Sequence, residues 1–204
     1  MKHYTLNDLG IAYVKIFNNA RELLEEAKIL FEHKRYARSY LLSQIAGEEL
    51  SKLIMVYNVA CDLCWNRKVD WKEFDKSLRS HIKKNRYNLI GLRMFSRLLD
   101  GVDVSDVVPY KEVNNIAETM NYAKNASLYS GEHQGNFVAP SDLYNIEHAK
   151  SIMSLNNKLF DYFNLVQIKD SSEFVRIISS KDTRGFVINL FNDISNINQN
   201  EQTE

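Results

Sequence analysis

The chain has 204 residues, and its 26 Lys and Arg balance its 26 Asp and Glu to a formal net charge of zero. The length suits one domain, and 45% hydrophobic residues are enough for a sizeable core, so a disordered chain is excluded. A neutral chain is a poor generic binder of polyanions unless its charge is unevenly distributed. Two Cys cannot form a disulfide framework, and no stretch approaches the roughly 18 apolar residues of a membrane span. We therefore expect a cytoplasmic protein with no contact to membranes.

Only two Pro and seven Gly punctuate the sequence, which favours a few long helices and an all-α class. From Asn7 to Leu30, apolar residues recur in alternating steps of four and three, and either Thr5 or Asn7 can cap this first helix. A second helix is predicted over residues 36–65. Its inward face is predicted from the residues at helical spacing, which are apolar except for Glu49: Leu42, Ala46, Glu49, Leu53, Val56, Ala60 and Leu63.

Three more long helices are predicted further along the chain. Asp70 opens a helix that runs without interruption past Phe95, a loop spans residues 100–109, and a fourth helix covers residues 113–128. Residues 130–141 predict a structured loop or short hairpin. Ser141 or Asp142 then caps a fifth helix, whose inward residues are Leu143, Ile146, Ala149, Met153, Leu159 and Phe163.

The C-terminal part of the chain predicts weaker elements. Residues 173–180 form a short helix, and a last helix after Gly185 uses Val187, Leu190, Ile194 and Ile197. The resulting expectation is one helical domain over residues 1–196, an antiparallel bundle of about five helices with a C-terminal helix packed on it. Residues 197–204 are expected to be a frayed polar tail.

Polar residues interrupt the apolar faces of three predicted helices. Glu49 interrupts the second helix, His81 with Lys84 and Asn85 the third, and Lys124 the fourth. His81 and Lys84 are one turn apart and project from the same face. If Glu49 met Lys84 or Lys124 inside the bundle, they would form a partly buried ion pair beside His81. A buried polar network that only fixes helix register is the alternative interpretation.

Glu48 stands next to Glu49 but about 100° around the helix. With Lys52 it could form an ordinary surface pair, the preferred interpretation for Lys52. For Glu48 a surface pair and a place in the site both stay open.

The neutral total hides a basic segment between residues 68 and 97. It has three acidic residues and nine basic ones, namely Lys68, Lys72, Lys76, Arg79, Lys83, Lys84, Arg86, Arg93 and Arg97. Such a stripe could contact RNA phosphates, with Lys76, Lys83 and Arg86 as the candidate ligands. A solvated surface balanced by acidic neighbours is the alternative.

Several familiar chemical motifs are missing or incomplete. Cys61 and Cys64 form a lone C-x-x-C without a second pair at zinc-finger spacing, and the Glu-x-x-His motif of di-iron bundles does not occur. Phosphate-binding glycine loops and hydrolase elbows are also missing. We therefore expect no metal and no cofactor.

Taken together, five segments resemble the AbiV-type abortive-infection proteins, whose domain belongs to the HEPN class of helical bundles. The resemblance covers residues 20–150. It rests on Ala20-Arg21-Glu22-Leu23-Leu24, Ala46-Gly47-Glu48-Glu49-Leu50-Ser51-Lys52, Asp70-Trp71-Lys72-Glu73-Phe74, Arg79-Ser80-His81-Ile82-Lys83-Lys84 and Lys124-Asn125-Ala126-Ser127-Leu128-Tyr129.

This resemblance implies an antiphage role, in which the infected cell halts phage multiplication by stopping translation after a phage product is sensed. It also implies a homodimer, since HEPN relatives are often dimers, and many are metal-independent ribonucleases with an Arg four to six residues before a His. Here Arg79 precedes His81 by only two residues. An altered constellation of His81, Lys84 and Arg79 is what this sequence offers instead.

As a ribonuclease site, His81 would act as base or acid, and Lys84, Lys124 or Arg79 would stabilise the phosphorane charge. Glu49 would orient the site, and Tyr129 would donate a proton or stack on a base. The alternative is a non-catalytic module that binds a phage protein, a ribosome or another translation component and acts by occupancy.

Overall fold

The computed structural model describes residues 3–101 and 109–180 of the chain. The helices are α1 (Leu6–Glu32), α2 (Tyr36–Cys64), α3 (Trp71–Arg79), α4 (His81–Leu99), α5 (Val113–Leu128), α6 (Pro140–Leu143), α7 (Ile146–Leu165) and α8 (Ser171–Ile178), with a 3-10 turn η1 (Tyr110–Glu112) before α5. The all-α class is confirmed. The predicted helix after Gly185, the tail 197–204 and most of the loop 100–109 lie outside the described residues.

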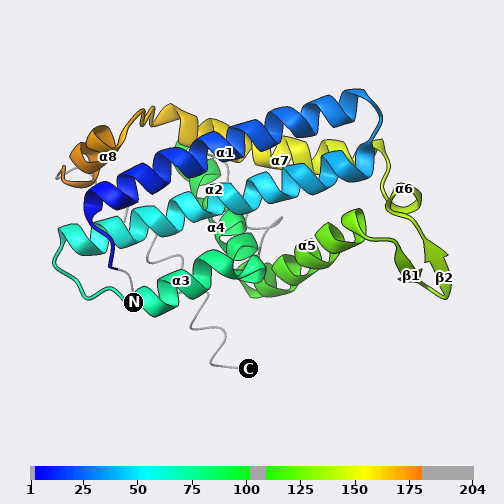
Figure 1. Cartoon of the computed structure of the whole chain (residues 1–204), viewed down its shortest axis with the longest axis horizontal. Helices are drawn as coiled ribbons and strands as arrows, with labels where there is room; N and C mark the ends of the chain where they lie inside the picture. The colour runs from blue at the N-terminus through cyan, green and yellow to red at the C-terminus, as the bar shows by residue number, and fades with distance from the viewer. Residues whose placement is uncertain (1–2, 102–108, 181–204) are drawn as a thin grey trace.

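Helix α2 is the centre of the bundle. It packs against α1, α4, α5 and α7, so that side chains are buried on almost every side of it. Figure 1 shows α1, α2 and α7 lying lengthwise side by side, with α8 at one end of the bundle and the hairpin at the other. No helix in the described part of the chain is both long and apolar enough to span a membrane.

The long predicted helix after Asp70 is in fact two helices. Ser80 adopts an extended conformation (φ −80°, ψ 113°), ends α3, and caps α4 by accepting a hydrogen bond from the Lys83 amide. Serine competes for backbone hydrogen bonds in this way, so it begins a helix more readily than it continues one. His81 is therefore the first residue of α4 and not a mid-helix residue.

The region before α7 combines one confirmed and one wrong prediction. The hairpin is present as β1 (Gly131–His133) and β2 (Asn136–Val138), which pair antiparallel with Glu132 opposite Phe137. However, Asp142 belongs to the short α6, and Asn145 caps α7 through the amides of Glu147 and His148. Because α7 begins at Ile146, this side chain is 43% exposed and does not face inward as predicted.

The C-terminal end of the described chain covers α1. The predicted short helix is confirmed as α8, whose Phe174 is fully buried and packs against Tyr13 of α1, with the ring centroids 5.0 Å apart and the rings tilted by 38°. Gly10 of α1 allows this approach, because a Cβ there would lie 3.0 Å from the backbone of Ser171.

Gly47 allows α2 to approach α4 and α7 closely. Its carbonyl accepts a hydrogen bond from Asn88 of α4 at 3.0 Å, and the Asn88 amide also reaches Asn156 of α7 at 3.1 Å. A Cβ on Gly47 would lie only 2.4 Å from Asn156 Oδ1 and 2.7 Å from Asn88 Nδ2. Glycine is required at this position because it has no side chain and so lets the helices pack closely, and not because of its backbone freedom.

We expect Gly47→Ala to lower the free energy of unfolding by about 1–3 kcal/mol, because the methyl group must displace two buried amides. Urea denaturation measures this loss. Gly131→Ala is the matched control, since a Cβ at Gly131 has nothing within 4 Å. Equal stabilities of the two variants would contradict the packing role of Gly47.

Candidate functional site

The most unusual side chain of the bundle is Glu48, a carboxylate on the central helix with 2% of its surface exposed. It lies on α2 between the fully buried Ala46 and Leu50, one turn from Ser51. A carboxylate removed from water must be paired, because an isolated buried charge is far too costly to maintain. The partners of Glu48 define the candidate site.

Three cationic or titratable groups surround the Glu48 carboxylate. Lys84 Nζ of α4 lies 2.6 Å from Oε2, and Lys124 Nζ of α5 lies 2.7 Å from Oε1. His81 Nδ1, at the start of α4, lies 2.7 Å from Oε2. We call Glu48, His81, Lys84 and Lys124 the Glu48 cluster. It joins three helices that are far apart in the sequence.

His81 is the member of the cluster that solvent can reach. Its side chain is 53% exposed, whereas those of Lys84 and Lys124 are 7% and 8% exposed. His81 Nδ1 lies 2.7 Å from Lys124 Nζ as well as from the carboxylate. The ring can therefore donate Nδ1–H to Glu48 or accept a hydrogen bond from Lys124, depending on its tautomer.

Glu49 does not occupy the place that its spacing predicts. Its carboxylate turns away from the cluster and accepts from Lys52 Nζ at 2.5 Å, and both side chains reach solvent. Of the two interpretations of Glu48, the structure places it in the buried cluster, and the pair with Lys52 is formed by Glu49 instead. The sequence pattern failed here because α2 is enclosed by four helices and has more than one buried face.

The other residues predicted for catalysis lie apart from the cluster. Arg79 is exposed at the end of α3, on the far side of the break at Ser80. Tyr129 follows the end of α5 and is 67% exposed, five residues beyond Lys124. In residues 3–101 and 109–180, no hydrogen bond or ion pair links either side chain to Glu48. His81, Lys84 and Lys124 are brought together, and Arg79, Glu49 and Tyr129 are not.

The three residues predicted to contact RNA phosphates lie in different environments. Lys76 is exposed on α3, whereas Lys83 of α4 forms an ion pair with Glu73 of α3. Arg86 is half-buried one turn beyond Ile82. The basic stripe of the sequence is therefore partly neutralised, and Lys84 is removed from it altogether by burial.

A layer of buried amides extends the cluster into the bundle, and only Asn85 among these residues was predicted from the sequence. Gln44 donates to Asn85 at 2.9 Å, and Asn85 donates to the Ala117 carbonyl at 3.1 Å. One turn further on, Asn156 donates to the Ser43 carbonyl at 2.8 Å and accepts from Asn88. The sequence did contain a signal for this layer, because polar residues recur at three- and four-residue spacing on α4, at positions 81, 84, 85 and 88.

The protonation of Glu48 depends on its partners. Burial raises the pKa of this carboxyl group, but hydrogen bonds from Lys124, Lys84 and His81 lower it by more, so that the pKa falls below its ordinary value of 4.5. Glu48 is consequently ionised at neutral pH. One negative charge faces two ammonium groups and an imidazole, so the cluster holds more positive than negative charge.

The described residues contain no group of three metal-ligating side chains. The C-x-x-C pair consists of free thiols, and burial raises the pKa of the Cys61 thiol to about 12. A thiol with so high a pKa stays protonated and is a poor nucleophile or ligand. The chemistry available to the site is that of a carboxylate, an imidazole and two ammonium groups.

The lowered pKa of Glu48 predicts a specific loss of stability in acid. A group with a depressed folded-state pKa stabilises the protein fully above its unfolded pKa, near 4.5, and this contribution disappears as the pH falls through the folded value. We expect the free energy of unfolding to fall more steeply between pH 5 and 3 (about the window of this titration) in the natural protein than in Glu48→Gln.

Urea denaturation across this pH range measures the difference. Glu49→Gln is the control, because the Glu49–Lys52 pair is partly exposed and contributes little. At neutral pH Glu48→Gln is expected to cost about 3–5 kcal/mol, since it leaves two buried ammonium groups without a counter-charge. Parallel pH profiles for the natural protein and Glu48→Gln would contradict this account of the cluster.

Comparison with known proteins identifies the family. No curated protein and no solved structure gives a significant match. A family model described as AbiV, of the HEPN type, matches residues 9–161, which is more than half of the chain and includes every member of the Glu48 cluster. The all-helical bundle agrees with this assignment. The chain therefore belongs to the AbiV family of HEPN-type proteins, a membership that points to abortive-infection defence.

Proposed function

We propose that this protein is an antiphage defence protein that halts phage multiplication by blocking translation, and that it does so by cleaving RNA without a metal at the Glu48 cluster. Family membership supports the defence role. The observation that carries the proposed chemistry is the half-exposed His81 imidazole held by a buried carboxylate. Such an arrangement fixes the ring and presents its other nitrogen outward.

The cluster contains the groups that RNA transesterification needs. A base must take the proton of the ribose 2′-OH, whose oxygen then attacks phosphorus while the bond from phosphorus to the 5′ oxygen breaks. With Nδ1–H donated to Glu48, His81 Nε2 carries a lone pair and can act as this base. With Nδ1 accepting from Lys124, Nε2 carries the proton and can deliver it to the leaving 5′ oxygen.

Positive charge at the same place would stabilise the phosphorane. Lys84 and Lys124 together outweigh the charge of Glu48, and an RNA phosphate beside His81 would lie in their field. The exposed Lys76 and Arg79 of α3 offer additional phosphate contacts, with Lys83 and Arg86 of α4 beside them. Glu48 is thus proposed as a positioning residue, the role that the sequence analysis gave to Glu49.

The complete reaction uses two copies of the chain. One His81 supplies a single proton-transfer group per protomer, and a homodimer would bring a second cluster to the same RNA. A phage-encoded protein is proposed to activate the dimer, with RNA or the ribosome as the target. The products would be a 2′,3′-cyclic phosphate and a 5′-hydroxyl end, which follow from the bonds formed and broken.

The test is the purified protein incubated with tRNA, rRNA and mRNA in the presence of a chelator. We expect cleavage with 5′-hydroxyl ends, and a loss of rate on the order of 100-fold or more in His81→Ala. His133→Ala, in the hairpin away from the cluster, is the matched control and should keep full activity. Thermal denaturation of both variants checks that the fold is retained.

Intact RNA in all samples, together with unchanged toxicity of the natural protein in cells, would eliminate the ribonuclease proposal. Equal loss in His81→Ala and His133→Ala would also contradict it. Because His81 is half-exposed, its replacement is expected to leave the fold intact, and an unchanged midpoint of thermal denaturation would separate a loss of cleavage from unfolding.

A second function is favoured by the burial of Glu48, Lys84 and Lys124, whose charges satisfy one another inside the bundle. In this alternative the cluster fixes helix register, and the protein acts by binding a phage protein or a translation component. Conservative replacements would then lower thermal stability and function together. In a catalytic site, loss of function instead accompanies retained or increased stability.

A further inference from the structure

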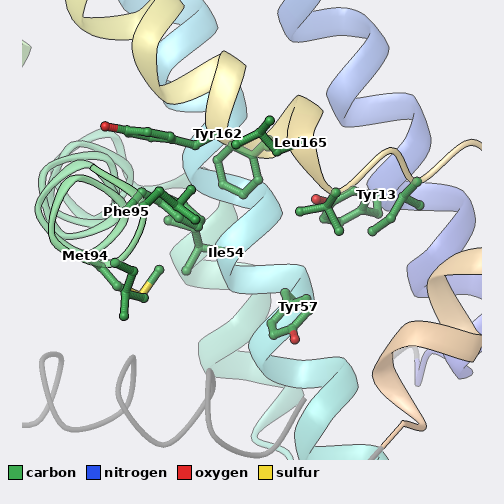
Figure 2. Close-up of a pocket in the computed structure, with 12 residues that line it drawn as sticks. Tyr13, Ile54, Tyr57, Met94, Phe95, Tyr162 and Leu165 are labelled. Atoms are coloured by element: carbon green, nitrogen blue, oxygen red, sulfur yellow. The ribbon is translucent and has the colours of Figure 1, made fainter. Parts of the chain in front are cut away.

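The hollows along α2 in residues 3–101 and 109–180 differ in the chemistry of their linings. The hollow shown in Figure 2 has a volume of about 320 Å³ and is lined by aliphatic and aromatic side chains of α1, α2, α4 and α7. Apart from tyrosine hydroxyls, its lining has no polar side chain, so it could select a ligand only by shape.

A second hollow, which we call the Asn58 pocket, is smaller and polar. It has a volume of about 210 Å³ and lies between α2, α3, α4 and the segment that joins α2 to α3. Asn58 follows Glu48 by ten residues, or about 15 Å along α2. The pocket is therefore separate from the Glu48 cluster.

Asn58 presents an acceptor that the rest of the protein leaves unused. This residue is 7% exposed and lines the pocket, and within the described chain its Oδ1 has no hydrogen-bond partner. Buried amide oxygens of folded proteins are almost always paired, because an unpaired one loses its hydrogen bonds to water without replacement. A ligand that donates a hydrogen bond to Asn58 would supply the missing partner.

Carboxylates give the Asn58 pocket its charge. Asp62, Asp70 and Glu73 line it, and Lys68 is the one cation among its lining residues in the described chain. The ion-pair partners of Asp62 and Glu73 do not line the pocket. Burial raises the pKa of the Asp62 carboxyl by more than Arg67 lowers it, so the charge of this carboxylate is incompletely compensated. The lining favours a cation that donates hydrogen bonds.

An aliphatic ammonium ion has the properties that this lining requires. Its three N–H donors can serve Asn58 and the carboxylates together. Phe74 and Tyr87 add aromatic walls, which pack against methylene groups and attract cations. The described residues hold no group of three metal-ligating side chains, so the carboxylates do not converge as a metal ion requires. Pockets for drug-sized molecules measure roughly 300–1,000 Å³, so this smaller pocket suits a short chain.

We propose that the Asn58 pocket binds the primary ammonium group of a short aliphatic amine, with Asn58 Oδ1 accepting one N–H and the carboxylates of Asp62, Asp70 and Glu73 supplying the counter-charge. The unpaired acceptor and the acidic lining carry this assignment together. It involves neither RNA cleavage nor the Glu48 cluster, so it can fail or succeed independently of the proposed ribonuclease.

An NMR titration of the isotope-labelled full chain with putrescine at constant ionic strength tests the proposal. The side-chain amide signal of Asn58 is assigned by its disappearance in Asn58→Leu. We expect this signal to shift in a saturable way, with a Kd of about 1 mM or tighter. Butanediol has the same chain length without the charge, and its affinity should be lower by roughly tenfold or more.

Two variants separate ligand binding from structure. Asn58→Leu has a side chain of similar volume and should weaken putrescine binding, followed at the backbone amides of Val59 and Val69, by about tenfold or more. Its stability toward urea should be unchanged or higher, because the unpaired oxygen is removed. Asp62→Asn keeps the shape of the side chain without its charge and should also weaken binding. Glu118→Gln, at an exposed carboxylate of α5, is the matched control and should bind putrescine as the natural protein does.

Nα-acetyl-lysine amide distinguishes the two sources of such an ammonium group. Tighter binding than that of putrescine would assign the pocket to a lysine side chain of a partner protein, and weaker binding would assign it to a free amine; both results support the ammonium chemistry. The absence of saturable shifts with either amine, or equal affinities for putrescine and butanediol, would overturn the proposal. Putrescine affinities that are unchanged in both Asn58→Leu and Asp62→Asn would overturn it as well.

Discussion

The buried Glu48 carboxylate is the constraint on which the arrangement of the bundle depends. Because Lys84 and Lys124 are themselves almost completely buried, each of the three charges is tolerable only while the other two are in place. This mutual dependence links α2, α4 and α5, which the hydrogen bonds from Gln44 to Asn85 and from Asn85 to the Ala117 carbonyl also connect. If any of the three helices were misplaced, a charge would remain unpaired in the interior. The ion pairs therefore select one helix register among those that apolar packing alone would permit.

The amides beside Glu48 continue this selection. Asn88 and Asn156 meet across Gly47, where α2, α4 and α7 come closest. Directional hydrogen bonds between buried side chains specify distance and rotation, which apolar contacts do not. The polar layer is therefore both the structural centre of the bundle and the setting of the proposed site, and these two roles are compatible because only His81 reaches solvent.

The sequence allowed the helices to be predicted well and the site only in part. Helical periodicity, few Pro and Gly, and capping residues such as Thr5 located α1, α2 and α5 to within a few residues. Periodicity also selected His81, Lys84 and Lys124. It chose Glu49 over Glu48 because a single apolar face was assumed, whereas a helix enclosed by four others has none that can be told apart by spacing. Contacts such as Asn88 with Asn156 depend on which helices become neighbours, and one sequence does not contain this information.

The extended Ser80 has a consequence for how such a protein can change over evolutionary time. Since α4 starts afresh at His81, the spacing of His81 and Lys84 is independent of the length and phase of α3. Substitutions at the exposed Lys76 and Arg79 of α3 can therefore change the basic exterior without altering the spacing of His81 and Lys84 on α4. The break thus separates an outer helix that carries exposed basic residues from an inner helix that carries the imidazole and one ammonium group of the Glu48 cluster.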